Sequence, residues 1–359
     1  MICPFLLLHL IIPLIDGSRW HLIEMVDGDG QGIVQYSYRS SHDTAIHIIT
    51  LGPSPSYSTG NVSEETEPPS LEESLILVGG EGTNGSVEVL GNPDCSSLSS
   101  SLSSYDNYAH SSFVTPDDIL MTCGRYRLSK SCFSYKNNSW EPHSTLLEER
   151  EHSPPVSLPM GVFLIGGTGV SSSDTTEFLP KGSSTWTTGP VPPNGAFGSC
   201  AVAIGDTQFL LIGGDPFEKP DQVIHYNTGT QSWTNWPRLT QGRLGCACVR
   251  AGNSIIVAGG YNKGTLLTST EVIDVISKSS RVVGHMKYPR AYFAMANVNF
   301  NPKVVLALGG ETEEWPEPST TVEEWNDDDE TWSLASITLS PGRSSFAAVV
   351  LPSVTACSP

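Results

Sequence analysis

A short apolar run that ends in two glycines recurs along the chain. The clearest copy, Phe209 to Trp233, is an apolar run closed by Gly213-Gly214, a polar loop, a second apolar run ending at Tyr226, a turn and a Trp. The last glycine of each copy falls at 80, 124, 167, 214, 260 and 310, so the intervals are 44, 43, 47, 46 and 50 residues. Six copies at nearly constant spacing predict a repeat architecture.

Each part of the repeat has a structural reason. The run before the glycines, for example Ile255–Ala258, is short, apolar and rich in β-branched residues, as a strand buried on both faces should be. Glycine permits a positive φ where the strand leaves the sheet. An aromatic residue and a Trp follow in four copies: Tyr135 with Trp140, Phe178 with Trp186, Tyr226 with Trp233, and Trp325 with Trp332. We expect these side chains to fill the gaps between neighbouring sheets, which must pack together in a ring.

These features resemble the kelch-repeat β-propeller family. The apolar run, double glycine, aromatic residue and spaced Trp are its signature, and the resemblance covers residues 73 to 352. It implies an all-β fold, a six-bladed kelch β-propeller. One copy, ILMTCG, departs from the pattern, and we interpret Cys123 as standing in place of its first glycine.

The C-terminal segment predicts how the ring closes. Ser344–Leu351 resembles the inner strands that open other blades, but no glycine pair follows it. The first blade, conversely, begins directly with its glycine-pair strand. We therefore expect the ring to be closed by the C-terminal strand joining the first blade, which removes exposed edges. The alternative donor is Ala45–Leu51.

Residues 1–72 and 353–359 lie outside the repeats. The apolar block in residues 1–17 is too short to span a bilayer and fits a signal peptide, although no Lys or Arg precedes it. A misassigned start or a buried strand is the alternative. Residues 18–72 form a non-repeat segment, in which Ile33–Tyr38 and Ala45–Leu51 could be strands, followed by a Pro/Ser/Glu-rich linker. Residues 353–359 are a C-terminal tail.

Cysteines and glycosylation motifs bear on the predicted export. Cys123 and Cys132 flank one predicted hairpin and could pair as a disulfide. Cys200 and Cys246 each lie thirteen residues before a glycine pair and are interpreted as buried free thiols in neighbouring strands. Three N-glycosylation motifs lie in predicted loops, at Asn61, Asn84 and Asn137.

Charge excludes some partners. The chain has 19 Lys and Arg against 38 Asp and Glu, a net charge of −19, which argues against nucleic acid or an anionic membrane as a general partner. Residues Glu311 to Glu330 include ten acidic residues among twenty, which we interpret as a solvated acidic loop rather than a metal site.

No motif predicts catalysis, a metal site or a cofactor. Asp27–Tyr38 resembles a calcium loop only at its start, because Tyr38 stands where a glutamate is required. His110 and His152 occupy similar positions near the expected channel and are interpreted as core or rim residues. Galactose oxidases resemble this chain in their kelch blades, but their copper-binding set of His and Tyr with a Tyr–Cys crosslink has no counterpart here.

Four arginines are the candidate ligand-binding residues. Each precedes a predicted inner strand at a similar place in its blade: Arg150, Arg243, Arg290 and Arg343. The kelch resemblance implies that arginines at this place face the channel mouth and bind acidic ligands, which a guanidinium group holds bidentately. The alternative is that they bond backbone carbonyls of the neighbouring blade and stabilise the ring.

Together these features predict a secreted kelch-repeat protein that acts as a non-catalytic protein-interaction module and binds an acidic peptide or protein at the channel mouth. One alternative is a carbohydrate-active enzyme, of the sugar isomerase or oxidase type. Another is an intracellular kelch adaptor that recruits substrates or binds the cytoskeleton, although nothing before residue 73 resembles a helical dimerisation module.

Overall fold

The chain divides into two compact units, Met1–Pro68 and Pro69–Pro359, each described here by itself. The computed structural model describes residues 8–13, 19–26, 32–39 and 47–51 of the first unit. In the second unit it describes residues 73–83, 85–90, 108–125, 129–136, 139–168, 175–214, 219–298, 304–313 and 317–352.

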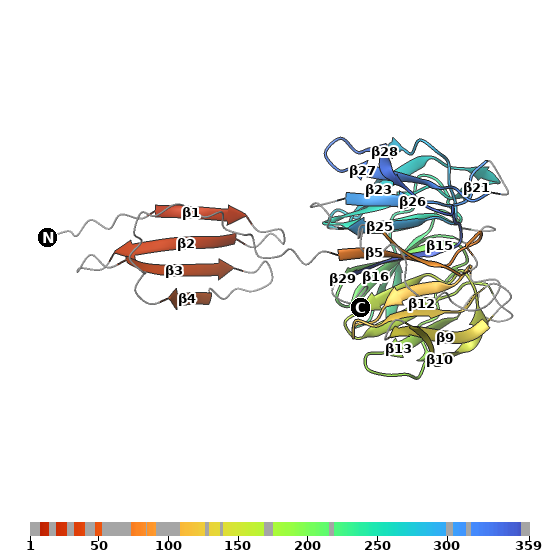
Figure 1. Cartoon of the computed structure of the whole chain (residues 1–359), viewed down its shortest axis with the longest axis horizontal. Helices are drawn as coiled ribbons and strands as arrows, with labels where there is room; N and C mark the ends of the chain where they lie inside the picture. The colour runs from red at the N-terminus through yellow and green to blue at the C-terminus, as the bar shows by residue number, and fades with distance from the viewer. Residues whose placement is uncertain are drawn as a thin grey trace. The chain divides into compact units, whose positions relative to one another are not determined.

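The first unit contains a four-stranded antiparallel sheet, drawn in red in Figure 1, with the strand order β1-β2-β3-β4. The strands are β1 (Leu8–Pro13), β2 (Arg19–Val26), β3 (Gly32–Arg39) and β4 (His47–Leu51). The two segments expected as possible strands fall in β3 and β4. Strand β1 lies within the segment expected to be a signal peptide, and export stays a prediction.

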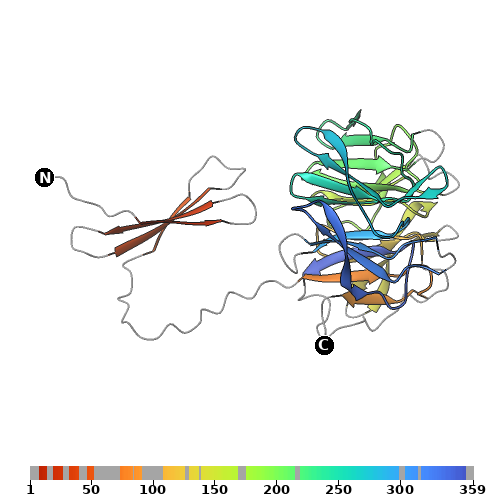
Figure 2. The same ribbon diagram turned by 90° about the horizontal axis from the view of Figure 1, so that it is seen from above.

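The second unit is a six-bladed β-propeller (Figures 1 and 2), as predicted. Blade one contains β5 (Glu73–Val78), β6 (Val87–Leu90) and β29 (Ala347–Pro352). Blade two contains β7 (Ser111–Val114), β8 (Leu120–Cys123), β9 (Ser129–Lys136) and β10 (Ser139–Arg150). Blade three contains β11 (Pro155–Leu158), β12 (Gly161–Ile165), β13 (Thr176–Pro180) and β14 (Thr187–Thr188).

Blade four contains β15 (Ser199–Gly205), β16 (Gln208–Gly213), β17 (Val223–Asn227) and β18 (Ser232–Asn235). Blade five contains β19 (Ala247–Ala251), β20 (Ser254–Ala258), β23 (Ser269–Asp274) and β24 (Ser279–His285), with a small hairpin of β21 (Tyr261–Asn262) and β22 (Thr265–Leu266) between its second and third strands. Blade six contains β25 (Ala294–Val298), β26 (Val304–Leu308), β27 (Thr321–Asn326) and β28 (Thr331–Thr338).

The C-terminal strand closes the ring. Strand β29 pairs antiparallel with β5, with Ala347 opposite Val78, and the two lie side by side in Figure 1. Strand β4, in the alternative donor segment, pairs with β3 instead. The predicted closure is therefore confirmed. The inner strands β29, β7, β11, β15, β19 and β25 each contact the next around the axis.

The hydrophobic core lies between the blades. The second strand of a blade is buried on both faces, so that Phe209, Leu210, Leu211 and Ile212 of β16 are all 0 % exposed. Leu210 and Ile212 pack with residues of β20 in blade five, while Phe209 and Leu211 pack with residues of blade three. Because each blade buries its faces against its neighbours, the stability of a blade depends on the blades on either side of it.

Three of the four expected aromatic pairs pack against each other in tilted contacts within their blades. The ring centroids lie 5.2 Å apart for Tyr135 and Trp140, 4.8 Å for Tyr226 and Trp233, and 5.3 Å for Trp325 and Trp332. Trp186 instead packs edge-on against Phe113 of the preceding blade, at 6.3 Å. The aromatic residues thus fill gaps both within and between blades.

In blades four, five and six, the first glycine of the pair is required by a close approach of the next blade. Gly259 has φ +60°, and a side chain there would overlap the carbonyl oxygen of Arg290. Gly124 has φ +68° and would overlap the carbonyl of Arg150 in the same way, and its N–H donates to Ser131 as that of Gly259 donates to Ser269. The interpretation of Cys123 was therefore wrong: Gly124 is the first glycine of its copy, and Arg125 replaces the second. Apolar runs of different length hid this one-residue offset.

The described residues include no helix that is long and apolar enough to cross a membrane.

Candidate functional site at the channel mouth

One residue just before each inner strand forms a ring around the propeller axis. These six positions share a left-handed backbone conformation, with φ between 48° and 67°: Ala109, His152, Gly198, Gly245, Tyr292 and Ser345. We call this ring the belt. A left-handed conformation is unusual for His and Tyr, and six equivalent occurrences mark a built feature of the fold.

Backbone hydrogen bonds join the belt from blade to blade. The N–H of His152 donates to the Ala109 carbonyl at 2.7 Å, that of Tyr292 to the Gly245 carbonyl at 2.8 Å, and that of Ser345 to the Tyr292 carbonyl at 2.8 Å. Ala109 and Gly245 make the same bond to Ser345 and Gly198. Five of the six seams between described belt residues carry this bond; between His152 and Gly198 no such bond is present.

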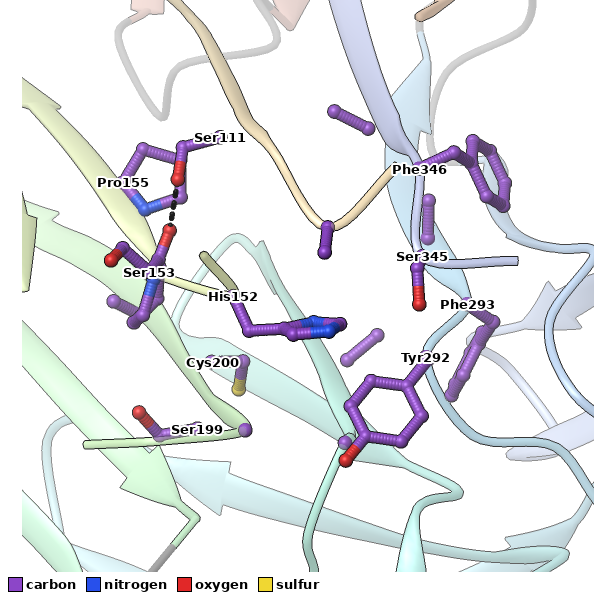
Figure 3. Close-up of a pocket in the computed structure, with 18 of the residues that line it drawn as sticks. Ser111, His152, Ser153, Pro155, Ser199, Cys200, Tyr292, Phe293, Ser345 and Phe346 are labelled. Carbon is purple, nitrogen blue, oxygen red and sulfur yellow. Dashed lines mark hydrogen bonds between the residues drawn. The ribbon is translucent and has the colours of Figure 1, made fainter. Parts of the chain in front are cut away.

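Two belt side chains meet over the axis. His152 belongs to blade three and Tyr292 to blade six, three blades away around the ring, and their ring centroids lie 5.0 Å apart (Figure 3). A cavity of about 280 Å³ adjoins them, bounded by the belt and the first residues of the inner strands. Ser111, Ser153 and Cys200 are among the side chains that line it.

The titratable groups of this cavity are uncharged at neutral pH. Burial lowers the pKa of His152 to about 4 and that of His110 to about 4, the latter against the opposing effect of the Val78 carbonyl. Burial, with Glu311 and Cys246 adding, raises the pKa of Tyr292 to about 12. Burial also raises the pKa of the Cys246 thiol to about 11. The cavity lining includes no Asp, Glu, Lys or Arg.

His110 has unused hydrogen-bonding capacity. Its side chain is 9 % exposed, it lines the cavity, and neither ring nitrogen makes a hydrogen bond with good geometry. A buried polar group without a partner is costly, so it marks a position where a ligand or water gains by binding. His110 and His152 do not occupy equivalent positions, since the belt position of blade two is Ala109.

The four arginines do not face the channel. Their side chains are 1 % exposed for Arg150 and 0 % for Arg243, Arg290 and Arg343. Each crosses its own blade to a glutamate on the third strand, with a distance of 2.7–3.1 Å between the guanidinium nitrogen and the carboxylate oxygen. The partners are Glu177, Glu271, Glu323 and Glu88, respectively.

The same guanidinium groups bond the glycine pair. Nη1 of Arg243 donates to the Gly259 carbonyl at 3.0 Å, and Arg150, Arg290 and Arg343 bond the first glycine of their blades likewise. Glu271 in turn accepts the backbone N–H groups of Thr240 and Gln241. We call this unit the arginine–glutamate clamp. Burial lowers the pKa of Arg150, Arg290 and Arg343, and the paired glutamates offset only part of this decrease.

This geometry agrees with the structural alternative given above in that the arginines bond backbone carbonyls, but these carbonyls belong to the arginine's own blade and not to the neighbouring one. The kelch resemblance suggested that the arginines face the mouth, but the guanidinium groups point into the blade, where they satisfy carbonyls that the glycine turn leaves without a strand partner. The sequence did locate the mouth indirectly, because the belt residue stands two positions after each arginine. Tyr292 was missed, and the spacing Arg-x-Tyr was the signal that could have found it.

Two disulfides lie in the described part of the chain. Cys123 pairs with Cys132, as predicted, and Cys200 pairs with Cys248 between the inner strands of blades four and five. The interpretation of Cys200 as a free thiol was wrong, whereas Cys246 is free and buried. A register shift in β15 between Ala203 and Gly205 adds one residue to that strand. Cys200 therefore lies one position beyond the equivalent of Cys246.

Three other predictions are placed as follows. Asn61, Asn84 and Asn137 lie outside the described residues. Within the described ranges, no group of three or more His, Cys, Asp or Glu side chains could hold a metal ion. The acidic segment from Glu311 is partly engaged, since Glu323 belongs to a clamp and Glu330 pairs with Arg281.

Comparisons with known proteins agree with this architecture. A family model described as "Kelch motif" matches residues 242–287, which span the arginine of blade five through its last strand. The solved structure described as "Structure of YjhT" superposes with a TM-score of 0.57 at 13 % sequence identity, covering 68 % of this chain and 88 % of that one. At this identity the likeness shows the fold alone. No curated protein matches the chain.

Proposed function

Because the chain carries a kelch motif and folds as a six-bladed β-propeller, we propose that it is a secreted, non-catalytic binding module that engages another protein at the belt. The observation that carries this proposal is the belt itself. Six equivalent residues hold a left-handed backbone conformation around one opening, and two of them, His152 and Tyr292, present aromatic side chains over a cavity.

The cavity lining supports recognition rather than chemistry. Its histidines are held neutral by burial, and its remaining polar groups are serine hydroxyls, a tyrosine and backbone groups. Such a surface recognises uncharged hydrogen-bonding groups. Tyrosine and histidine over a cavity also provide the aromatic anchors on which protein interfaces depend.

The disulfides support an extracellular location. Cys200–Cys248 joins two blades and Cys123–Cys132 joins two strands of one blade, and such bonds persist in oxidising compartments. The clamp arginines are not part of the proposed interface, because they are buried and paired.

A blocked mouth tests the proposal. The variant Ser345→Trp places a large side chain at a belt position, where Tyr292 shows that an aromatic residue fits the same backbone conformation. The matched control is Ser333→Trp, an exposed position on the outer strand β28. Full-length wild-type protein is used to isolate partners from extracellular fluid, and each identified partner is purified and titrated against all three proteins.

We expect Ser345→Trp to lose binding by at least tenfold while Ser333→Trp matches the wild type. Equal binding by all three proteins would place the interface elsewhere and overturn the proposal, as would the absence of any partner that binds when purified.

A further inference from the structure

A tyrosine and two glutamates stand at equivalent positions on the belt side of blades five, six and one. Glu311 directly follows the glycine pair of blade six and Glu81 that of blade one, the position that Tyr261 occupies in blade five. The Tyr261 hydroxyl donates to Oε2 of Glu311 at 2.9 Å, and the Ser344 hydroxyl donates to Oε2 of Glu81 at 3.3 Å. These bonds orient both carboxylates and leave Oε1 of each outside them.

The two glutamates stand at equivalent positions of adjacent blades, six and one, each bridged to the residue just before a belt residue. Burial, with the negative charge of Glu81 adding, raises the pKa of Glu311, although the bond from Tyr261 lowers it. Burial, with Glu311 adding, raises the pKa of Tyr261 and of Tyr292. A cation placed between Glu81 and Glu311 would relieve this repulsion.

Aromatic rings continue from Tyr261 across the mouth. The ring centroids lie 6.3 Å apart for Tyr261 and Tyr292, 5.0 Å for Tyr292 and His152, and 5.7 Å for His152 and Phe197. The negative faces of such rings attract ammonium and guanidinium groups. We call Glu81, Glu311, Tyr261 and Tyr292 the acidic rim.

Among the residues that the structure describes, no Lys or Arg forms a salt bridge with Glu81 or Glu311. Arg125, which follows the first glycine of blade two, already takes part in an interaction. Lys263 is exposed at the turn of the β21–β22 hairpin. The clamp arginines are buried against their own glutamates.

The cavity beside the rim supplies a second, independent sign of a ligand. Tyr292 belongs to both the rim and the cavity lining, and His110, nine-tenths buried, lines the same cavity with neither ring nitrogen in a hydrogen bond of good geometry. A neutral imidazole offers one donor and one acceptor, which suits a peptide amide or hydroxyl group.

We propose that the acidic rim binds a lysine or arginine side chain of a peptide segment, with Glu311 and Glu81 pairing its charge, Tyr261 and Tyr292 packing against it, and uncharged neighbouring groups of the segment entering the cavity. The inference rests on the proposed function in taking the ligand to be protein. It reverses the expected charge of that ligand, since the sequence alone predicted an acidic one. A metal ion fits less well, because hard cations need more oxygen ligands than the two carboxylates offered here.

Direct titration of a defined peptide tests the charge preference. The probe is fluorescein-labelled Gly-Ser-Lys-Lys-Ser-Gly, compared with the same peptide carrying glutamate in place of both lysines, and binding to the full chain is measured by fluorescence anisotropy. We expect the lysine peptide to bind, the glutamate peptide to fail, and the affinity to fall as salt rises.

Three variants locate the site. Glu311→Gln and Glu81→Gln should each weaken the lysine peptide about tenfold, since each removes one charge-assisted contact. Glu313→Gln makes the same charge change two residues from Glu311 at an exposed position, and should bind like the wild type. Unchanged urea midpoints show that the variants are folded.

Equal affinity of Glu311→Gln and Glu313→Gln, or a preference for the glutamate peptide, would overturn the rim proposal. If the lysine-peptide test fails but Ser345→Trp still weakens binding of a protein partner, the rim proposal is wrong and the proposed function stands. Conversely, the lysine peptide could bind in a way that depends on Glu311 while no protein partner loses affinity with Ser345→Trp. That result would support the rim proposal and contradict the proposed protein-binding function.

Discussion

Blades four and five use different residues to satisfy the carbonyl group of the first glycine of their glycine pair. In blade five, the clamp formed by Arg243 and Glu271 satisfies the carbonyl of Gly259, the first glycine of its pair. In blade four, Ala196 and Ile224 occupy the positions of that arginine and glutamate, both buried. The side-chain amide of Gln222 donates there to the Gly213 carbonyl at 3.0 Å and to the Gly195 carbonyl at 2.9 Å.

The segment before the inner strand also differs between the two blades, in a way that matches the replacement of the arginine and glutamate. Glu271 accepts the N–H of Thr240, three residues before Arg243. Three residues before Ala196 stands Pro193, which has no N–H to donate. A glutamate in blade four would lack this donor, and the neutral amide of Gln222 instead accepts from Asn194.

The comparison shows that the two blades share a satisfied glycine carbonyl and do not share a charged pair. Once buried, however, the two solutions differ in their response to change. A buried ion pair leaves an uncompensated charge when one partner is removed, whereas an amide leaves only neutral groups unpaired.

The largest expected effect is the loss of Glu271. The variant Glu271→Ala leaves the fully buried Arg243 without its carboxylate and the N–H groups of Thr240 and Gln241 without an acceptor. We expect the free energy of unfolding to fall by about 3–5 kcal/mol, measured by urea unfolding.

Placing the blade-four residues at the equivalent positions of blade five tests whether the lost stability comes from the unpaired charge. The triple variant Arg243→Ala, Ser269→Gln, Glu271→Ile should be more stable than Glu271→Ala alone, because no buried charge remains. If Glu271→Ala costs less than about 1 kcal/mol, the clamp does not stabilise blade five and the comparison fails.

The next effect concerns the belt, where blades four and five have glycine and blade three has His152. The pKa values of His152 and His110 in the folded protein, each about 4, lie below the ordinary value of 6.5. The unfolded chain therefore binds the proton first, and stability present above pH 6.5 is lost as the pH falls from about 6.5 towards 4. We expect a loss of up to about 3 kcal/mol for each histidine.

The variant His152→Gly copies the belt position of blades four and five and isolates this effect. Urea unfolding at pH 7.5 and pH 4.5 should show a smaller loss for the variant than for the wild type, because one of the two histidines no longer titrates. Identical pH dependence of the two proteins would mean that His152 is protonated as easily in the folded chain as in the unfolded one.

The smallest expected effect is that of Gln222→Ala. It removes two donors from the Gly195 and Gly213 carbonyls, so the free energy of unfolding should fall by about 1–3 kcal/mol, less than for Glu271→Ala. Gln208→Ala in the same blade, at the start of β16, serves as the control: it also removes a glutamine amide, but it breaks a hydrogen bond to the His225 side chain and none to a glycine carbonyl. A larger loss for Gln222→Ala than for Glu271→Ala would reverse the ranking of the two solutions.

Much of the fold could be predicted because each repeat carries its own local signals. The run Phe209–Ile212 followed by Gly213-Gly214 predicts a buried strand and a left-handed turn. The segment ending at Leu351, which no glycine pair follows, predicts the closing strand. The pairing of Cys123 with Cys132 could be predicted for the same reason, since a hairpin of nine residues' separation brings them together. Local periodicity and short turns act between residues that are near in sequence.

The candidate site could be predicted only in part. Arg243 and Arg290 stood out by their spacing, but the direction of their side chains depends on Glu271 and Glu323, 28 and 33 residues further on. The pairing of Cys200 with Cys248 depends on an irregularity in β15 that adds one residue to the strand, and a count along the sequence cannot detect it.

By itself, the sequence determined that the chain makes six glycine-terminated sheets and closes them with its last strand, because these choices follow from hydrophobic period and turn chemistry. Only the tertiary structure decided that the arginines are internal clamps and that His152 meets Tyr292 over the axis. Contacts across the ring join residues far apart in sequence, and burial, rather than residue type, determines which charges remain to meet a ligand.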